Sequence, residues 1–271
     1  MNRLGPSDAA VFETYVVPRY MALFAEPMLE MFVPGREARV CHLACRTGYP
    51  DALVHERLPN AHIYGFDASE HAIEVAKAKA RALSGAISDY RAAREFPTPF
   101  ADGAFSHAFT LHLPVTHEER ASVLGEIGRI VAPSGQALVA MPLRGSFFEI
   151  ADLLRECALK RELPKLAEAI DFAMAMRPTE DLFARELSAA GFDTVDVTAR
   201  KRTLTFATGR ELFEDPTTRL MLLPEWRASL TVDHLEAALA YVREAVDKYF
   251  RDDELELTVE VGVASGRRAA S

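Results

Sequence analysis

Residues 40–51 of this 271-residue chain read VCHLACRTGYPD. The apolar residues of 38–45 predict a buried strand, a turn follows, and 49–58 has the spacing of a helix. A second strand is predicted at 61–68 and includes Asp67 near its end. In open parallel sheets, ligands bind outside the carboxyl ends of the strands, and an acid at the end of the second strand suits a ribose. These two segments therefore predict a site for a small ligand.

Short apolar strands alternate with longer amphipathic stretches in the first half of the chain. This alternation is typical of a parallel sheet with helices on both faces, so it predicts a doubly wound α/β fold. Ser69 is a predicted N-cap, and Thr116 with Glu119 has the spacing of a capping box. The further elements that we expect here are strands at 104–113 and 136–143, helices at 69–83 and 116–131, and a turn at 132–136.

Helical segments frame this core. Residues 7–33 predict a helical N-terminal segment that is broken near Pro18 and Pro27. Helices are also predicted at 145–177, 181–192 (ending at Gly191) and 208–250, and strands at 193–207 and 255–266. We interpret the chain as one domain, 1–271. Its parts are a helical cap (1–36), a ligand-binding core (37–144), two helical inserts that act as a lid (145–180 and 208–250), and a C-terminal helix with strands (181–207 and 251–271).

Composition excludes several classes of protein. Hydrophobic residues make up 49% of the chain and charged residues 26%, and no apolar run approaches the roughly 20 residues that span a bilayer. The N-terminus lacks the pattern of a secretory signal, so we expect a cytoplasmic protein without a membrane partner. A net charge of −9 argues against nucleic acid as a partner. The three cysteines, Cys41, Cys45 and Cys157, are interpreted as small buried residues, with no metal site.

Three stretches together resemble the class I S-adenosylmethionine-dependent methyltransferases. VCHLACRTG (40–48) resembles the first motif of that family, IYGFDAS (63–69) resembles the second, and 96–142 resembles the long stretch that follows. The resemblance implies a Rossmann-like, seven-stranded mixed sheet whose last strand is antiparallel. It also implies S-adenosylmethionine as the cofactor, with contacts from His42, Ala44, Arg46, Gly48, Asp67 and Ala68.

The chain departs from the family pattern at chemically important positions. His42 stands where the family has an acid near the methionyl ammonium of the cofactor; a neutral imidazole lacks that charge, and a protonated one would repel the ammonium. Arg46 replaces a glycine, at a position where the backbone passes close to the ligand. Ser106 replaces an aspartate. Asp89 and Glu95 are candidates for the acid that faces the adenine.

Three functions stay open on this evidence. The first is methyl transfer to a small-molecule acceptor, with His112 as a candidate catalytic base. The second is an inactive relative that binds a protein partner, in which Arg46 pairs with Asp67 and fills the pocket. The third is an enzyme that uses the fold for other chemistry, such as a cyclisation. Aromatic and methionine residues of the first insert are expected either to line an acceptor pocket or to pack in a core (Phe147, Phe148, Phe172, Met174 and Met176). The second insert is a candidate surface for a homodimer.

Overall fold

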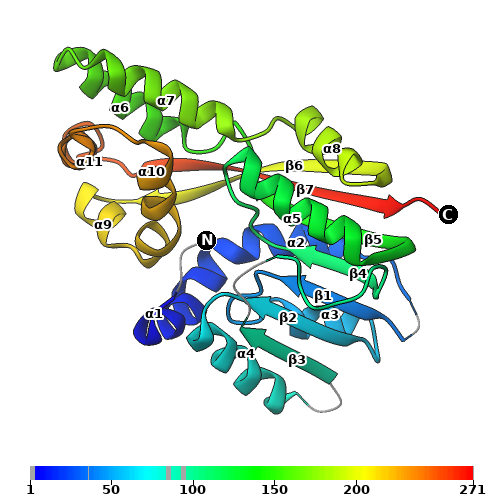
Figure 1. Cartoon of the computed structure of the whole chain (residues 1–271). Helices are drawn as coiled ribbons and strands as arrows, with labels where there is room; N and C mark the ends of the chain where they lie inside the picture. Colours follow the sequence, from blue (N-terminus) through cyan, green and yellow to red (C-terminus); the bar gives the residue numbers. More distant parts are fainter. Residues whose placement is uncertain (1–3, 36, 84–86, 93–95, 271) are drawn as a thin grey trace. The chain divides into compact units, whose positions relative to one another are not determined.

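The computed structural model describes residues 4–35, 37–83, 87–92 and 96–270 (Figure 1). The chain forms two compact units. Unit 1 consists of 1–141, 180–198 and 262–271, and unit 2 consists of 142–179 and 199–261. The interpretation as one domain with a lid stays a prediction.

A seven-stranded sheet runs through the chain in the order β3-β2-β1-β4-β5-β7-β6. It is mostly parallel, with the last strands of the chain antiparallel, which is a Rossmann-like arrangement. The strands are β1 (Arg39–Leu43), β2 (His62–Asp67), β3 (Ile87–Ala92), β4 (Phe105–Thr110), β5 (Val131–Pro142), β6 (Phe192–Phe206) and β7 (Leu255–Arg268). The predicted fold class is confirmed, and β3 is a strand that the sequence analysis did not place.

Strands β1, β2, β3 and β4 pair in parallel, so their carboxyl ends lie at one edge of the sheet. In this register His42 is opposite Gly65, and Gly65 is opposite Tyr90. A Cβ atom on Gly65 would lie 2.3 Å from Cδ1 of Tyr90. The glycine therefore leaves the space that the ring of Tyr90 occupies.

Four helices of unit 1 follow the predicted pattern. They are α3 (Asp51–Arg57), α4 (Glu70–Ala82), α5 (His117–Ile130) and α8 (Glu180–Ala189). Ser69 caps α4, because its Oγ accepts a hydrogen bond from the backbone N–H of Ala72 at 3.2 Å. Thr116 is the N-cap of α5, but its hydroxyl donates to the carboxylate of Glu119 instead of accepting from the backbone.

Two predictions of chain breaks are wrong. Residues 6–31 form consecutive helical segments, α1 (Pro6–Val11), the π-helix η1 (Phe12–Met21) and α2 (Ala22–Met31). Pro18 lies inside η1, where the wider turns accommodate a residue that lacks a backbone N–H, and Pro27 lies inside α2. Residues 132–136 belong to β5, where a bulge shifts the register with β4.

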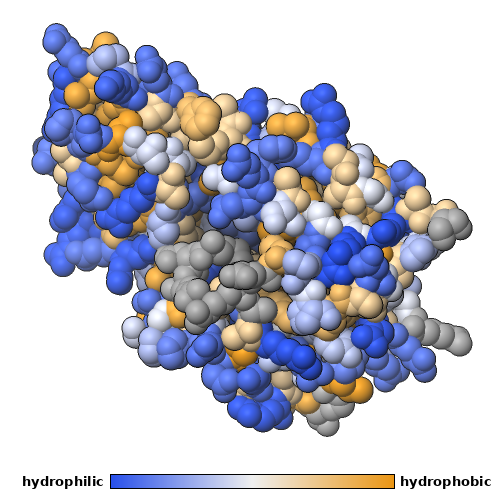
Figure 2. Space-filling view, viewed as in Figure 1, coloured by the Kyte–Doolittle hydropathy of each residue, from blue (hydrophilic) through white to orange (hydrophobic). Residues whose placement is uncertain are grey.

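Unit 2 contains both predicted helical inserts. The first is the pair α6 (Phe148–Lys160) and α7 (Pro164–Met176), which pack on each other. The second is α9 (Gly209–Glu214), η2 (Thr218–Leu222), α10 (Leu223–Ser229) and α11 (Leu235–Tyr249). Figure 2 shows apolar side chains among hydrophilic ones where α6 and α7 reach the surface, and Leu159 and Phe172 are 80% and 65% exposed there.

Candidate functional site

The turn after β1 keeps the conformation of a ligand-binding loop. Ala44, Arg46 and Gly48 all have left-handed backbones, with φ angles of 56°, 48° and 74°. Gly48 also needs its lack of a side chain, because a Cβ atom there would lie 3.0 Å from Cβ of Ala76. Arg46 therefore takes a left-handed conformation at the energetic cost that a side chain adds to such a residue.

Asp67 holds this turn from the end of β2. Its buried carboxylate accepts the backbone N–H of Arg46 at 3.0 Å and the backbone N–H of Ser69 at 2.9 Å. The next residue, Ala68, is half-buried and adds no polar side chain. A carboxylate has about four lone-pair directions, so two backbone donors leave capacity for ligand hydroxyls.

The side chain of Arg46 extends toward the N-terminal helices. Its guanidinium carbon lies 5.9 Å from the centre of the Phe12 ring in η1, a cation–π geometry. Leu4, which precedes α1, is tied to the start of α4, since the hydroxyl of Ser69 donates to the carbonyl of Leu4 at 2.7 Å. The backbone N–H of Arg46 is thus hydrogen-bonded to Asp67, while its guanidinium lies over the ring of Phe12.

His42 is not an isolated imidazole. Its Nδ1 lies 2.7 Å from Oδ1 of Asp51, the first residue of α3, and both side chains are at most 2% exposed. The ring stacks on Phe109 of β4, with 4.0 Å between the ring centres. The sequence analysis missed Asp51, so its expectation that position 42 had lost its negative charge is incomplete: a carboxylate lies directly behind the imidazole.

Tyr90 completes a buried network that the sequence analysis also missed. Its hydroxyl donates to Oδ2 of Asp51 at 2.7 Å. Burial, and next the charge of Asp51, raise the pKa of Tyr90 far above its usual value, so the phenol stays a donor. The glycine within the β2 pattern at Gly65 was the available sequence signal for such a close approach.

His112 follows β4 at the same edge of the sheet, half-buried. Its Nε2 lies 3.2 Å from the hydroxyl of Tyr20, a fully buried residue of η1. The imidazole also contacts the edge of the Phe24 ring. The structure therefore brings His112 to the edge that carries the turn and Asp67, with a phenol that orients its ring.

Other candidates lie away from this edge. Asp89 is in the middle of β3 and pairs with His62 at 3.1 Å, so the prediction that it faces an adenine is wrong, and Glu95 lies outside the described residues. Ser106 joins β4 to β1 through both backbone groups of Arg39. The three cysteines are buried as predicted, and burial raises the pKa of each.

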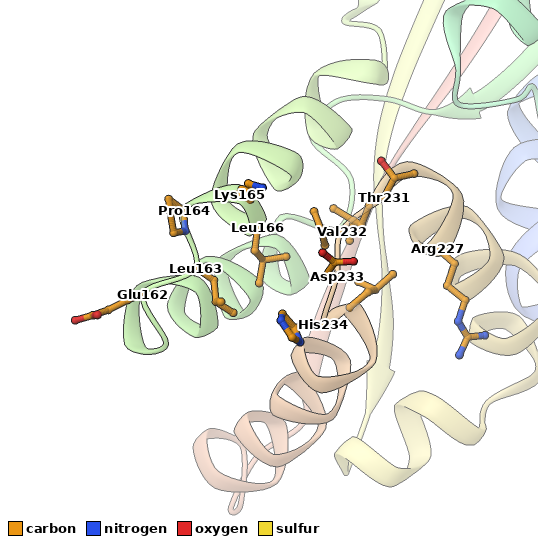
Figure 3. Close-up of a pocket in the computed structure, with 12 residues that line it drawn as sticks. Glu162, Leu163, Pro164, Lys165, Leu166, Arg227, Thr231, Val232, Asp233 and His234 are labelled. Atoms are coloured by element: carbon orange, nitrogen blue, oxygen red, sulfur yellow. The ribbon is translucent and has the colours of Figure 1, made fainter.

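The candidate acceptor-pocket residues divide between a core and the surface of unit 2. Phe147 and Met174 line a cavity of about 30 Å³ with Arg177, whose guanidinium lies over the Phe147 ring. Phe148 and Phe172 are 45% and 65% exposed. Unit 2 also has an open hollow of about 750 Å³, where the turn between α6 and α7 faces the loop between α10 and α11 (Figure 3).

The comparisons with known proteins agree with this geometry. Residues 40–135 match the family model described as a methyltransferase domain. This stretch of the chain is therefore similar to a methyltransferase domain. The matched residues run from β1 into the start of β5, and they include the turn, Asp67 and His112.

Two curated relatives and a solved structure give the range of similarity. The chain is 31% identical to a ubiquinone/menaquinone biosynthesis C-methyltransferase of Desulfotalea psychrophila over 39% of this chain and 41% of that protein, so it spans less than half of this relative. It is 26% identical to an O-methyltransferase of Aspergillus nomiae, over 60% of this chain and 68% of the relative. The geranyl diphosphate C-methyltransferase of Streptomyces coelicolor shares the fold, with a TM-score of 0.53 at 14% identity over 92% of this chain and 80% of that one.

The donor set of the site fits the cofactor that the domain implies. The turn has left-handed backbones at Ala44 and Gly48, Asp67 offers a carboxylate for hydroxyls, and His42 forms a buried hydrogen-bonded pair with Asp51 behind the turn. Among the residues that the structure describes, no cluster of three or more His, Cys, Asp or Glu is arranged to hold a metal ion. No helix in the described ranges is long and apolar enough to cross a membrane.

Proposed function

We propose that this protein transfers a methyl group from S-adenosylmethionine to a small-molecule acceptor. The observation that carries the proposal is the intact turn: Arg46 has taken a glycine position, yet the left-handed path at 44, 46 and 48 and its bonds to Asp67 remain. Asp67 would accept the ribose hydroxyls, and the backbone of the turn would contact the amino-acid part of the cofactor. The methyltransferase relatives support this assignment, while the acceptor is inferred only as a class.

His112 is the residue that we propose as the catalytic base. Bound S-adenosylmethionine would supply a methyl group on a positively charged sulfonium. An acceptor O–H or acidic C–H must lose a proton as its new bond to carbon forms, and His112 would take that proton. Tyr20, 3.2 Å from Nε2, would orient the imidazole. Because holding the reactants in line supplies much of the rate, His112 is expected to contribute about 10²- to 10⁴-fold and no more.

Calorimetry with S-adenosylmethionine and S-adenosylhomocysteine tests the cofactor site. We expect micromolar binding by the natural chain, a loss of tenfold or more in Asp67→Ala, and an unchanged affinity in Asp89→Asn, which alters an acid of β3 that pairs with His62. A second candidate function, a non-catalytic binding protein, is favoured by Arg46. Binding that is absent in the natural chain and gained in Arg46→Gly would establish that candidate and refute ours.

Turnover is the second test. A panel of phenols and quinols is incubated with the protein and S-adenosylmethionine, and the formation of S-adenosylhomocysteine is measured. His112→Gln is expected to lower the rate by about 100-fold or more with little change in cofactor affinity, whereas Tyr20→Phe is expected to have a smaller effect. Equal rates in His112→Gln and the natural chain would remove His112 as the base. The expected cytoplasmic location, a homodimer and a protein partner stay predictions.

A further inference from the structure

The helices of unit 2 border two spaces that share one wall. The first is the open hollow of about 750 Å³ between the α6–α7 turn and the loop that joins α10 to α11, and the second is the inner cavity of about 30 Å³. Leu230, the residue that ends α10, lines both spaces and is only 4% exposed. The hollow and the inner cavity therefore adjoin at this side chain.

The inner cavity is apolar apart from two side chains. Its walls include Phe147 and Trp226, which are 2% and 5% exposed, and its polar lining residues are Arg177 and Ser229. The hydroxyl of Ser229 donates to the carbonyl of Glu225 at 2.9 Å, so its proton is used. Arg177 is 4% exposed, and its Nε has no hydrogen-bond partner among the residues that the structure describes. A buried donor without a partner is unfavourable, so this atom favours a ligand that brings an acceptor.

The charge of Arg177 is already balanced within unit 2. Its Nη2 forms an ion pair with Oε1 of Glu225, whose side chain is 12% exposed. The guanidinium also lies over the ring of Phe147, with its carbon 5.1 Å from the ring centre. A second anion beside this pair would leave a net negative charge in a buried place, which is strongly unfavourable. The pair therefore favours a neutral acceptor, such as a carbonyl oxygen, over a carboxylate or a phosphate.

The hollow supplies the room that the inner cavity lacks. A space of about 30 Å³ admits a group of the size of a water molecule, whereas about 750 Å³ is typical of sites for small molecules. Leu166 of α7 is buried and points toward the loop that carries the half-buried Val232 (Figure 3). Charged lining residues, among them Lys165 and Asp233, are exposed. The hollow thus offers apolar contacts close to Leu230 and charged groups at the surface.

We propose that unit 2 binds a neutral, largely apolar small molecule that carries one acceptor oxygen. This oxygen accepts a hydrogen bond from Nε of Arg177 in the inner cavity, and the apolar part of the molecule extends past Leu230 into the hollow. The residues of this site belong to unit 2, whereas the turn at 44–48, Asp67 and His112 belong to unit 1. The inference is therefore additional to the proposed function and does not depend on the cofactor.

The first test uses the natural full-length chain without S-adenosylmethionine. Calorimetry compares 2-octanone, which is neutral and has a carbonyl oxygen, with octanoate, which has the same number of carbon atoms and a negative charge. We expect a Kd of about 1 mM or lower for 2-octanone and at least tenfold weaker binding of octanoate. Trp226 is the single tryptophan of the chain and lines the inner cavity, so its fluorescence should change with the same Kd on addition of 2-octanone.

Two variants test the two ends of the contact. Ala173 of α7 lines the inner cavity, so Ala173→Leu should fill it and weaken the binding of 2-octanone at least tenfold. Ala169→Leu, at a half-buried position of the same helix outside the lining, is the matched control and should change the Kd less than about twofold. The double variant Arg177→Met, Glu225→Leu removes the donor and its counter-charge together, so no lone charge is buried, and it should also bind 2-octanone at least tenfold more weakly.

The outcomes separate this inference from the proposed function. No binding of 2-octanone by the natural chain, equal binding of octanoate, or an unchanged Kd in Ala173→Leu would each overturn the site in unit 2. None of these results concerns methyl transfer, which is measured with S-adenosylmethionine, and a failure of that cofactor to bind would leave the site in unit 2 in place.

Discussion

Replacing Gly65 with alanine should damage the site from beneath, through Tyr90 and Cys45. The new Cβ would lie 2.3 Å and 2.6 Å from two ring carbons of Tyr90 and 3.0 Å from Sγ of Cys45. Overpacking of this kind costs about 1–3 kcal/mol. The ring must also shift by about 1 Å or more to restore ordinary contact distances, which breaks the bond to the Asp51 carboxylate at a cost of about 1.5–3 kcal/mol. The free energy of unfolding should therefore fall by about 2.5–6 kcal/mol.

A double-mutant cycle separates the two contributions. Tyr90→Phe removes the hydroxyl but keeps the ring, so Gly65→Ala in that background should cost only the overpacking part, about 1–3 kcal/mol. Urea unfolding of the four proteins, followed by far-UV circular dichroism, gives the coupling energy, expected to be about 1.5–3 kcal/mol. The reasoning is refuted if Gly65→Ala costs the same in both backgrounds, because the ring would then move without losing Asp51, or if it costs less than about 1 kcal/mol.

Three further predictions concern stability. Arg120 of α5 is 1% exposed and donates hydrogen bonds to both oxygens of Glu186. Glu186→Gln should therefore lower the free energy of unfolding in urea by about 3–5 kcal/mol, and the apolar double variant Arg120→Met, Glu186→Leu should lower it less. A loss under about 1 kcal/mol in Glu186→Gln would contradict this. Because Arg46 has a φ of 48°, Arg46→Gly should be more stable than Arg46→Ala by about 0.5–1 kcal/mol, and the reverse order would argue against a left-handed residue. Burial lowers the pKa of His107 below 6.5, so unfolded chains bind its proton at higher pH, and the free energy of unfolding should fall as the pH drops below about 6.5. His107→Gln should flatten that slope between pH 7 and 5, whereas an unchanged slope would assign it to other groups.

Much of the fold follows from local patterns in the sequence. Alternating apolar strands and amphipathic helices predicted β1, β2, β4 and the helices between them, because each pattern matches the period of one kind of backbone. The break expected near Pro18 and the turn expected at 132–136 were wrong because both were inferred from local residues alone. Pro18 lies inside a π-helix and Pro27 inside an α-helix, so neither proline ends its helix, and a bulge that keeps a strand going looks like a turn when its partner strand is unknown.

The candidate site was predictable only in part. Asp67 and the turn at 44–48 were found because the ends of two neighbouring strands must share an edge. Asp89 was misplaced because nothing local sets how far along β3 it lies; strand pairing puts it opposite Tyr64, and its carboxylate contacts His62.

The sequence by itself determined the α/β class, the methyltransferase motifs and the substitutions at 42 and 46, since these depend on the order of residues along the chain. Only the tertiary structure decided what the substitutions mean. His42 meets Asp51 and Tyr90 because three elements converge, and Arg46 reaches Phe12 because a helix from the N-terminus lies against the turn. Hydrogen bonds and charges act over a few ångströms of space, so residues far apart in sequence become chemical partners only when the sheet and its helices have formed.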